Sequence, residues 1–161
     1  MSWIIRDLRI EDNRKIALVI RKSLEEHGVA KPGTVYTDPT TDDLFDLFQT
    51  KGSAYFVAEE NGEILGGCGV YPTVGLPSGF GELVKLYVSS DARGKGIGQT
   101  LMDRTAQAAR ELGYQQLYLE TLPELAKAVS LYKRSGYTNL DKPLGESGHF
   151  ACTILMIKEL G

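Results

Sequence analysis

Glycine recurs at alternate positions in one short stretch of this sequence, between an apolar segment and an amphipathic one. Residues 82–88 are apolar at most positions, as in a strand buried on both faces, and residues 97–112 carry apolar side chains at helical spacing. The glycines between them are Gly94, Gly96 and Gly98. Because a helix start presents unpaired N–H groups and a partial positive charge, glycines here allow an anion to approach the backbone closely. The stretch therefore predicts a strand, an anion-binding loop and a helix in succession.

Two common glycine-loop motifs do not fit this stretch. The dinucleotide-binding pattern G-x-G-x-x-G fails because Gln99 stands at the position of its third glycine. The Walker pattern fails because Gly94-Lys95-Gly96 lacks the Ser or Thr that follows the Gly-Lys pair. The structural alternative is a glycine turn that only lets the strand and the helix pack. Arg93 and Lys95 add local positive charge to the loop, which favours an anionic ligand.

The size and charge of the chain limit its function. With 161 residues, 42% of them hydrophobic, we expect a single domain over residues 1–161 with a sizeable core. A net charge of −3 offers no general attraction to nucleic acid or to an anionic membrane, so an anionic ligand has to be held locally. The apolar stretch at the N-terminus has only three apolar residues before the first charged one, which is too short for a secretory signal or a membrane span. We expect a cytoplasmic protein that binds neither nucleic acid nor membrane.

Periodicity and turn residues predict the order strand, two helices, three strands, helix, strand, helix, two strands. The clearest local signal is Asn61-Gly62 between two β-prone runs, which is typical of a tight hairpin. The last two strands are expected over residues 137–140 and 150–157. Three connections rich in turn residues are expected as long loops: residues 28–41, 72–81 and 141–149.

Two motifs of the chain resemble signatures of the GNAT superfamily of N-acetyltransferases. In ELVKLYVSSDARGKGIGQTLM, the pattern R/Q-x-x-G-x-G/A is matched after a strand by Arg93, Gly96 and Gly98. AKAVSLYKRSGY is similar to the family segment A-x-x-L-Y-x-x-x-G-F through Ala128, Leu131, Tyr132, Gly136 and Tyr137. The element order over nearly the whole chain is also similar. The resemblance implies an α/β (α+β) fold, with a mixed, mostly antiparallel central sheet and helices on both faces.

The resemblance implies acetyl-CoA as co-substrate and no metal. In this family, acetyl-CoA lies across a splayed pair of central strands. Its pyrophosphate is expected on the backbone N–H groups of the glycine loop: Arg93, Gly94, Lys95, Gly96, Ile97, Gly98, Gln99 and Thr100. Its pantetheine arm is expected along the preceding strand, beside Leu86, Tyr87 and Val88. The N–H of Val88 is expected to face the thioester carbonyl and to stabilise its oxyanion.

Direct attack of a neutral amine on the thioester, which the resemblance also implies, requires two proton transfers. Tyr132 matches a family tyrosine that protonates the departing thiolate; the alternative is a tyrosine that only fills the helix interface. Glu82 matches a glutamate that removes the amine proton in several relatives; the alternative is a solvated carboxylate at a strand end. A regular strand puts Glu82, Val84, Leu86 and Val88 on one face. Because the family often has a bulge in this strand, the face on which each residue lies is not decided by the sequence. Glu120, at the end of the next strand, is the second candidate for the base.

The acceptor amine is expected at the thioester end of the fold, between the three long loops. The polar candidates on or next to these loops are Tyr36, Asp38, Asp42, Glu146 and His149. A free amino acid, a small amine, a peptide N-terminus and a lysine side chain all stay open as acceptors. One departure from the family pattern is Leu125, which stands where many relatives carry an Asn that contacts the coenzyme.

Two other functions use the same residues. In a non-catalytic acetyl-CoA-binding sensor, neither Glu82 nor Tyr132 would reach the thioester. Acyl transfer through a cysteine would need Cys68 or Cys152 beside a histidine and an orienting acid. Both cysteines fall in predicted strands and are expected to be buried thiols, which argues against this function. Dimers are frequent in the family, so a homodimer is an expectation from the resemblance alone. The leading prediction is an acetyl-CoA-dependent N-acetyltransferase that acts on a primary amine of a small molecule or peptide.

Overall fold

A mixed seven-stranded sheet forms the centre of the protein, for which a computed structural model describes residues 2–161. The strands are β1 (Ile4–Asp7), β2 (Ala54–Glu60), β3 (Glu63–Tyr71), β4 (Phe80–Val88), β5 (Gln116–Thr121), β6 (Thr138–Leu140) and β7 (Ile154–Glu159). Their order across the sheet is β1-β2-β3-β4-β5-β7-β6, and every neighbouring pair is antiparallel except β4 and β5. This confirms the predicted mixed, mostly antiparallel sheet.

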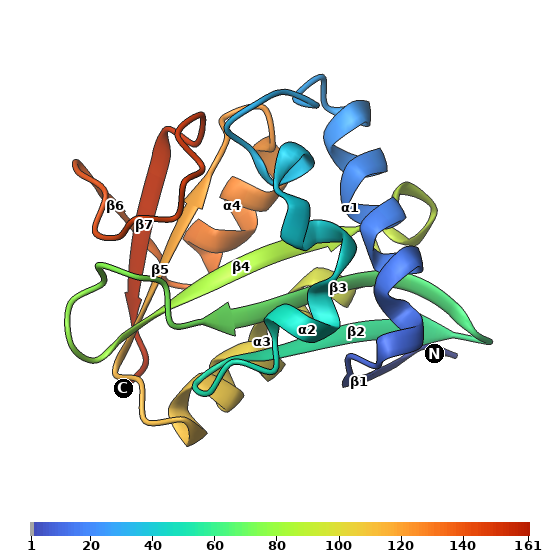
Figure 1. Cartoon of the computed structure of the whole chain (residues 1–161), viewed down its shortest axis with the longest axis horizontal. Coiled ribbons are helices and arrows are strands. Elements are labelled where there is room, and N and C mark those ends of the chain that lie inside the picture. Colours follow the sequence, from blue (N-terminus) through green and yellow to red (C-terminus); the bar gives the residue numbers. More distant parts are fainter. Residues whose placement is uncertain (1) are drawn as a thin grey trace.

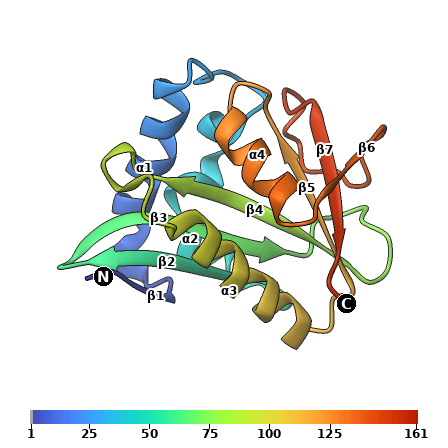
Figure 2. The same ribbon diagram turned by 180° about the vertical axis from the view of Figure 1, so that it is seen from behind.

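Helices cover both faces of this sheet. They are α1 (Asn13–Glu26), α2 (Leu44–Leu47), α3 (Ile97–Glu111) and α4 (Ala126–Arg134). α1 and α2 lie on the face that is turned to the viewer in Figure 1, and α3 and α4 lie on the opposite face, in front of the sheet in Figure 2. The two faces have separate cores, one built around Ile16 and Ile20 of α1 and the other around Leu101 and Ala109 of α3. The predicted helices on both faces are therefore confirmed.

The hairpin between β2 and β3 forms where the Asn61-Gly62 pair predicts it. Both residues have positive φ, 52° for Asn61 and 83° for Gly62, as a tight turn with the twist of the flanking strands requires. At the other end of the sheet the final strand is shorter than expected: β7 begins at Ile154 instead of residue 150. Cys152 consequently lies in the preceding loop, while Cys68 lies in β3 as predicted.

The parallel strands β4 and β5 pair at one end only. Phe80–Glu82 of β4 is in register with Gln116–Tyr118 of β5, and no β4–β5 pairing follows within the described residues 2–161. Beyond this point β5 continues to pair with β7 as far as Thr121, and β4 continues along β3 as far as Val88. The carboxyl-terminal halves of the two strands therefore diverge, and backbone groups that face the gap are free of sheet partners.

A bulge interrupts β4 beside this gap. Val84 is opposite Gly69 and Tyr87 is opposite Gly67, so β4 carries one residue more than β3 over this span. Lys85 at this bulge has φ 54°, a left-handed conformation that is unfavourable for a residue with a side chain. The hydroxyl of Tyr55 donates to the Lys85 carbonyl at 2.8 Å and stabilises the bulge. The structure therefore contains the bulge whose presence the sequence did not decide.

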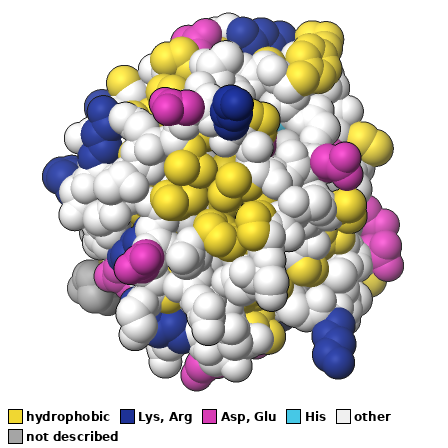
Figure 3. Space-filling view, turned by 90° about the vertical axis from the view of Figure 1, so that its left-hand side faces the viewer, with side chains coloured by type: hydrophobic (Ala, Val, Ile, Leu, Met, Phe, Trp, Pro, Cys, Tyr) yellow, Lys and Arg dark blue, Asp and Glu magenta, His cyan; other side chains and the backbone are white. Residues whose placement is uncertain are grey.

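An apolar region lies on the side of the molecule that carries β6 and the loop between β3 and β4 (Figure 3). Figure 3 shows hydrophobic side chains gathered at the centre of this side. In the same loop Val74 is 71% exposed. Contiguous apolar surface is typical of faces that bind a partner, and the homodimer stays a prediction. In the described part of the chain, no helix has the length and hydrophobicity to cross a bilayer.

Candidate active site

The glycine loop presents a row of free backbone donors. Within residues 2–161, the N–H groups from Gly94 to Gln99 have no backbone acceptor. The flanking amides are used inside the protein, since the Arg93 N–H donates to the Ser90 carbonyl at 3.4 Å and the Thr100 N–H donates to the Gly96 carbonyl at 3.1 Å. Of the eight predicted donors, the amides of Arg93 and Thr100 are therefore engaged, and the six from Gly94 to Gln99 are available to an anion at the start of α3. Binding of the pyrophosphate there stays a prediction.

The three glycines of this loop have different structural roles. Gly94 and Gly96 have φ of 83° and 78°, and a Cβ added to either would meet no atom within 4 Å. They open space over the free amides. Gly98 instead allows close packing, because an added Cβ would lie 3.3 Å from Leu131 of α4 and 3.8 Å from Val88 of β4.

Arg93 positions the loop with its side chain. Its Nε donates to the Val88 carbonyl at 3.0 Å, and its Nη2 donates to the Ser23 hydroxyl of α1 at 3.1 Å and lies 3.6 Å from Glu26. The guanidinium thus ties the end of β4 to α1. The Arg93 side chain is 30% exposed at the edge of the loop. We expect that it contributes to anion binding mainly by holding the loop in position.

The backbone N–H of Val88 points into the gap between β4 and β5. Ser89, the next residue, donates its N–H to the Leu65 carbonyl at 2.8 Å, on the side of β3. Because successive N–H groups along a strand point to opposite edges, the Val88 N–H is directed away from β3. The geometry is that expected for a donor to a ligand lying in the gap.

A cavity lies beside this gap, and it contains both predicted catalytic residues. Its lining residues are Thr34, Val35, Glu82, Leu83, Val84, Lys85, Leu86, Tyr87, Glu120, Thr121, Leu122, Leu125, Tyr132, His149 and Cys152. The structure thus brings Glu82 and Tyr132 together with Leu86 and Tyr87. Leu125, the departure from the family pattern, is an apolar wall of this cavity.

Tyr132 enters the cavity from α4. It is 6% exposed, and its ring packs edge-on against Tyr137 with centroids 5.8 Å apart. Its hydroxyl has no hydrogen bond to any part of the chain that the structure describes. Burial raises the pKa of this phenol well above its ordinary value, so the group stays protonated at neutral pH and is able to donate.

Glu82 is buried at the point where β4 and β5 separate. Its side chain accepts a hydrogen bond from the Thr73 hydroxyl at 2.5 Å. The pKa of this carboxyl is raised to about 7, mainly by burial; the Thr73 hydrogen bond opposes the shift, and the nearby Glu120 adds to it. A carboxyl with its pKa near neutrality is well matched to accept a proton from a substrate and to release it again.

All three long loops reach this cavity. The loop after β3 supplies Thr73 to Glu82, and the loop before β7 supplies Ser147, whose hydroxyl donates to Glu120. The first loop supplies Asp38, which lies 3.0 Å from His149 Nε2. The predicted meeting of the three loops at one end of the fold is therefore present. Three other candidates of the first and last loops lie elsewhere: Tyr36 bonds to Glu25 of α1, Asp42 pairs with Arg21 of α1, and Glu146 packs on Gly75.

Asp38 joins the first loop, the last loop and the bulge of β4. Its Oδ1 accepts from the Thr40 N–H and hydroxyl, and its Oδ2 lies 3.0 Å from His149 and 3.9 Å from the Lys85 ammonium. The His149 hydrogen bond, above all, holds the pKa of this carboxyl well below its usual range. Because an ionised carboxylate only accepts, the Nε2 atom of His149 carries the proton of this bond.

Lys85 and Cys152 are two of the cavity residues that the sequence did not place at the site. Lys85 is a charged residue among the apolar residues of the second half of β4, which was the available signal. A regular strand, however, gives no reason to direct it toward Glu82. Cys152 was assigned to a strand that begins later. Burial raises the pKa of both cysteine thiols to about 12, and for Cys152 the carboxyls of Glu120 and Glu82 add to this shift, so both stay as thiols at neutral pH.

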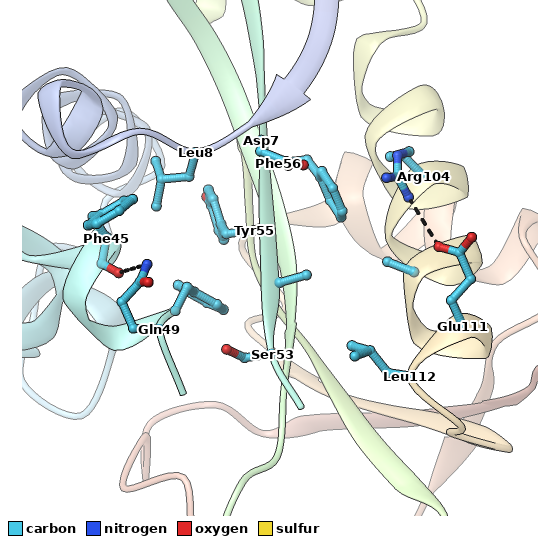
Figure 4. A pocket seen from close by; sticks show the side chains of 13 residues that line it. Asp7, Leu8, Phe45, Gln49, Ser53, Tyr55, Phe56, Arg104, Glu111 and Leu112 are labelled. Atoms are coloured by element: carbon cyan, nitrogen blue, oxygen red, sulfur yellow. Dashed lines mark hydrogen bonds and ion pairs between the residues drawn. The ribbon is translucent and has the colours of Figure 1, made fainter. Parts of the chain in front are cut away.

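A second hollow lies at the edge of the sheet, on both sides of β2, and differs in its chemistry. Figure 4 shows Leu8 and Tyr55 on one side of the strand and Arg104, Glu111 and Leu112 on the other. Its volume is about 410 Å³, and its only buried polar atom without a hydrogen bond in the described chain is Nη1 of Arg104. It has no buried carboxyl comparable to Glu82. The described residues also contain no group of His, Cys, Asp and Glu that is arranged to hold a metal ion.

Comparison with known proteins identifies the family of the chain. The model of the acetyltransferase (GNAT) family matches residues 20–137, which include the glycine loop and α4. The chain is 39% identical over 160 residues, covering 99% of its length and 96% of the relative, to the uncharacterized N-acetyltransferase YjgM of Escherichia coli.

Solved structures show the same fold. An acetyltransferase of the GNAT family from Staphylococcus aureus superposes with a TM-score of 0.87 at 18% identity, covering 99% of this chain and all of the other. A phosphinothricin acetyltransferase of Sinorhizobium meliloti, solved in complex with AcCoA, superposes with a TM-score of 0.77 at 24% identity over 100% of this chain and 90% of the other. From the family match and the full-length relative together, the chain belongs to the acetyltransferase (GNAT) family of N-acetyltransferases.

Proposed function

We propose that this N-acetyltransferase moves the acetyl group of acetyl-CoA directly to a primary amine of a small molecule or peptide. The observation that carries the proposal is the position of the cavity with Glu82 and Tyr132 next to the free amides of the glycine loop, where β4 and β5 diverge. The direct test is release of CoA thiol from acetyl-CoA in the presence of an amine panel, followed together with the mass of the protein. Amine-dependent release with unmodified protein supports direct transfer.

In the proposed complex, acetyl-CoA lies along the gap with its pyrophosphate at the glycine loop and its thioester at the cavity. The amides from Gly94 to Gln99 receive its pyrophosphate, and the open space over Gly94 and Gly96 admits the phosphate oxygens. The pantetheine arm then follows β4 past Leu86 and Tyr87 and brings the thioester to the cavity. The solved complex of the Sinorhizobium meliloti enzyme with AcCoA, in the same fold, supports acetyl-CoA as the ligand.

The Val88 N–H stabilises the developing oxyanion. It has no partner in β3 and points into the gap, where the thioester carbonyl is expected. Attack of the amine places negative charge on this oxygen, and loss of one such donor costs about 3 kcal/mol in well-studied hydrolases. Most of the remaining acceleration comes from holding the two reactants together, which supplies on the order of 7 kcal/mol or more.

The acid and the base are Tyr132 and Glu82. The lone pair of the neutral amine forms the C–N bond, and the C–S bond breaks as the tetrahedral intermediate collapses. Glu82, directly or through water, takes the proton that the nitrogen loses, and Tyr132 gives a proton to the departing thiolate of CoA. The raised pKa of each group favours its role, because Tyr132 stays protonated and Glu82 is half-ionised near pH 7.

Replacing Tyr132 by phenylalanine is expected to lower kcat by about 10²-fold, at the lower end of general acid–base effects because a thiolate leaves readily. The Kd of acetyl-CoA should change little, since the ring and its contact with Tyr137 remain. Steady-state kinetics and titration calorimetry measure the two quantities. Tyr137→Phe is the matched control, because it removes a buried hydroxyl that does not line the cavity. Equal kcat values for the two variants would show that Tyr132 only packs in the core and does not act as the acid.

Replacing both cysteines by alanine is expected to leave acetyl transfer within about threefold of the wild-type rate, since neither thiol ionises readily at neutral pH. Mass spectrometry of the wild-type protein after incubation with acetyl-CoA alone should show the unmodified mass. A stable adduct of one acetyl group at Cys152, lost in the Cys152→Ala variant together with activity, would establish a covalent route instead.

A further inference from the structure

Lys85 is a buried cation that the protein itself does not fully pair. Its side chain is 5% exposed, and its ammonium makes no hydrogen bond to any of the described residues. The nearest acid, Asp38, has its Oδ2 3.9 Å away, beyond hydrogen-bond distance. Asp38 is already bonded by Thr40 and His149. An ammonium in this position keeps only slight contact with solvent and gains only a distant counter-charge, which is costly for a group with three donors.

The backbone is arranged to keep Lys85 in this position. The bulge of β4 and the positive φ of Lys85 turn its side chain into the cavity, on which Glu82 also borders. The Tyr55 hydrogen bond to the Lys85 carbonyl stabilises that conformation. A strained backbone that aims a weakly paired charge, with its nearest acid 3.9 Å away, into a cavity indicates a ligand group at that point.

The cavity is therefore divided by charge. Lys85 supplies hydrogen-bond donors and positive charge, and the carboxyls of Glu82 and Glu120 supply acceptors and negative charge. All three border one hollow of about 40 Å³, which has room for the charged groups at one end of an acceptor. A molecule with an amine and an anion separated by a few bonds satisfies both sides at once.

We propose, on the basis of the N-acetyltransferase function above, that the acceptor is a free α-amino acid whose carboxylate binds the Lys85 ammonium and whose amino group faces Glu82. The carboxylate completes the hydrogen bonds that Lys85 lacks. It also orients the nitrogen toward the gap in which the thioester lies. A simple amine or a lysine side chain satisfies Glu82 but leaves Lys85 unpaired, so it binds more weakly.

The test compares matched acceptors in a CoA thiol-release assay. The panel contains the protein amino acids, the α-amides of the same amino acids, putrescine, and a lysine peptide blocked at both ends. We expect the best amino acid to exceed its own amide in kcat/KM by about 10- to 100-fold, the range for a hydrogen bond between charged groups. Equal rates for acid and amide, or turnover of only putrescine or the peptide, would overturn the amino-acid assignment while leaving acetyl transfer established. No release with any amine would remove the proposed function and this inference with it.

Lys85→Met separates binding of the acceptor from other effects. Methionine is of similar length and apolar, and the backbone hydrogen bond of the bulge does not depend on the side chain. At a pH where Glu82 is ionised in both proteins, we expect the KM of the amino acid to rise by about 10- to 100-fold, with the KM of acetyl-CoA and the kcat/KM of the amide unchanged. Lys85→Arg, which keeps a cation, should recover part of the loss. A rise in the KM of acetyl-CoA, or an equal loss for acid and amide, would assign Lys85 to the coenzyme or to structure and refute the inference.

Discussion

Replacing Gly96 by glutamate is expected to abolish measurable binding of acetyl-CoA, raising its Kd by more than about 10²-fold. Gly96 has φ 78° directly before α3, and open space lies where its side chain would be. Glutamate would place a carboxylate in that space, against the free amides that receive the pyrophosphate. The repulsion acts in addition to the backbone cost of about 1 kcal/mol for a side chain in the left-handed region. Titration calorimetry with acetyl-CoA and with CoA measures the change.

Two controls separate charge from backbone strain in this experiment. Gly113, at the other end of α3, also has positive φ, 93°, and open space around an added Cβ, so Gly113→Glu introduces the same strain and charge away from the loop. It should bind acetyl-CoA like the wild type. Gly96→Ala adds strain without charge and should weaken binding only several-fold. Unchanged affinity in the Gly96→Glu variant would show that the pyrophosphate lies elsewhere.

The elements with strong local signals were predictable from the sequence. The hairpin at Asn61-Gly62, the loop before α3 and the end of α4 at Gly136 each depend on residues whose own backbone preferences specify the conformation. The sheet order β5-β7-β6 depends on contacts between distant segments. The resemblance to the family implied a mixed, mostly antiparallel sheet, and this strand order was not predicted.

The composition of the cavity was only partly predictable, because it depends on a bulge and on loop ends. Nothing in the apolar run of β4 indicates that Lys85 turns inward, since a strand without a bulge directs residues 82 and 85 to opposite faces. The late start of β7 placed Cys152 at the site instead of in the sheet. Asp38 and His149 were candidates on separate loops, but their pairing is a tertiary contact over more than a hundred residues of sequence.

Replacing Glu82 by glutamine is expected to lower kcat by about 10³-fold, within the range for loss of a general base. Glutamine keeps the size of the side chain and its hydrogen bond from Thr73. It removes the group that takes the amine proton. The Kd of acetyl-CoA should stay within about twofold, because the free amides of the loop and the end of β4 are unchanged. Stopped-flow or steady-state thiol release with the best acceptor gives kcat, and calorimetry gives the Kd.

The pH dependence of the wild-type rate tests the same role. Burial raises the pKa of Glu82 to about 7, and only its ionised form accepts a proton, so kcat should rise with pH through about pH 7 and level above it. Below that value the rate should fall about tenfold for each pH unit, as expected for one protonation. The Glu82→Gln variant should lose this inflection, because the titrating group has been removed.

Glu120→Gln is the variant that discriminates between the two carboxyls. Glu120 accepts hydrogen bonds from Tyr118, at 2.6 Å, and from Ser147, so its lone pairs are more fully used than those of Glu82. We expect its loss to lower kcat by no more than about tenfold and to keep the inflection, shifted to lower pH, because Glu120 itself raises the pKa of Glu82. If Glu120→Gln instead abolishes the inflection and Glu82→Gln retains it, Glu120 is the base, and Glu82 serves to position the acceptor.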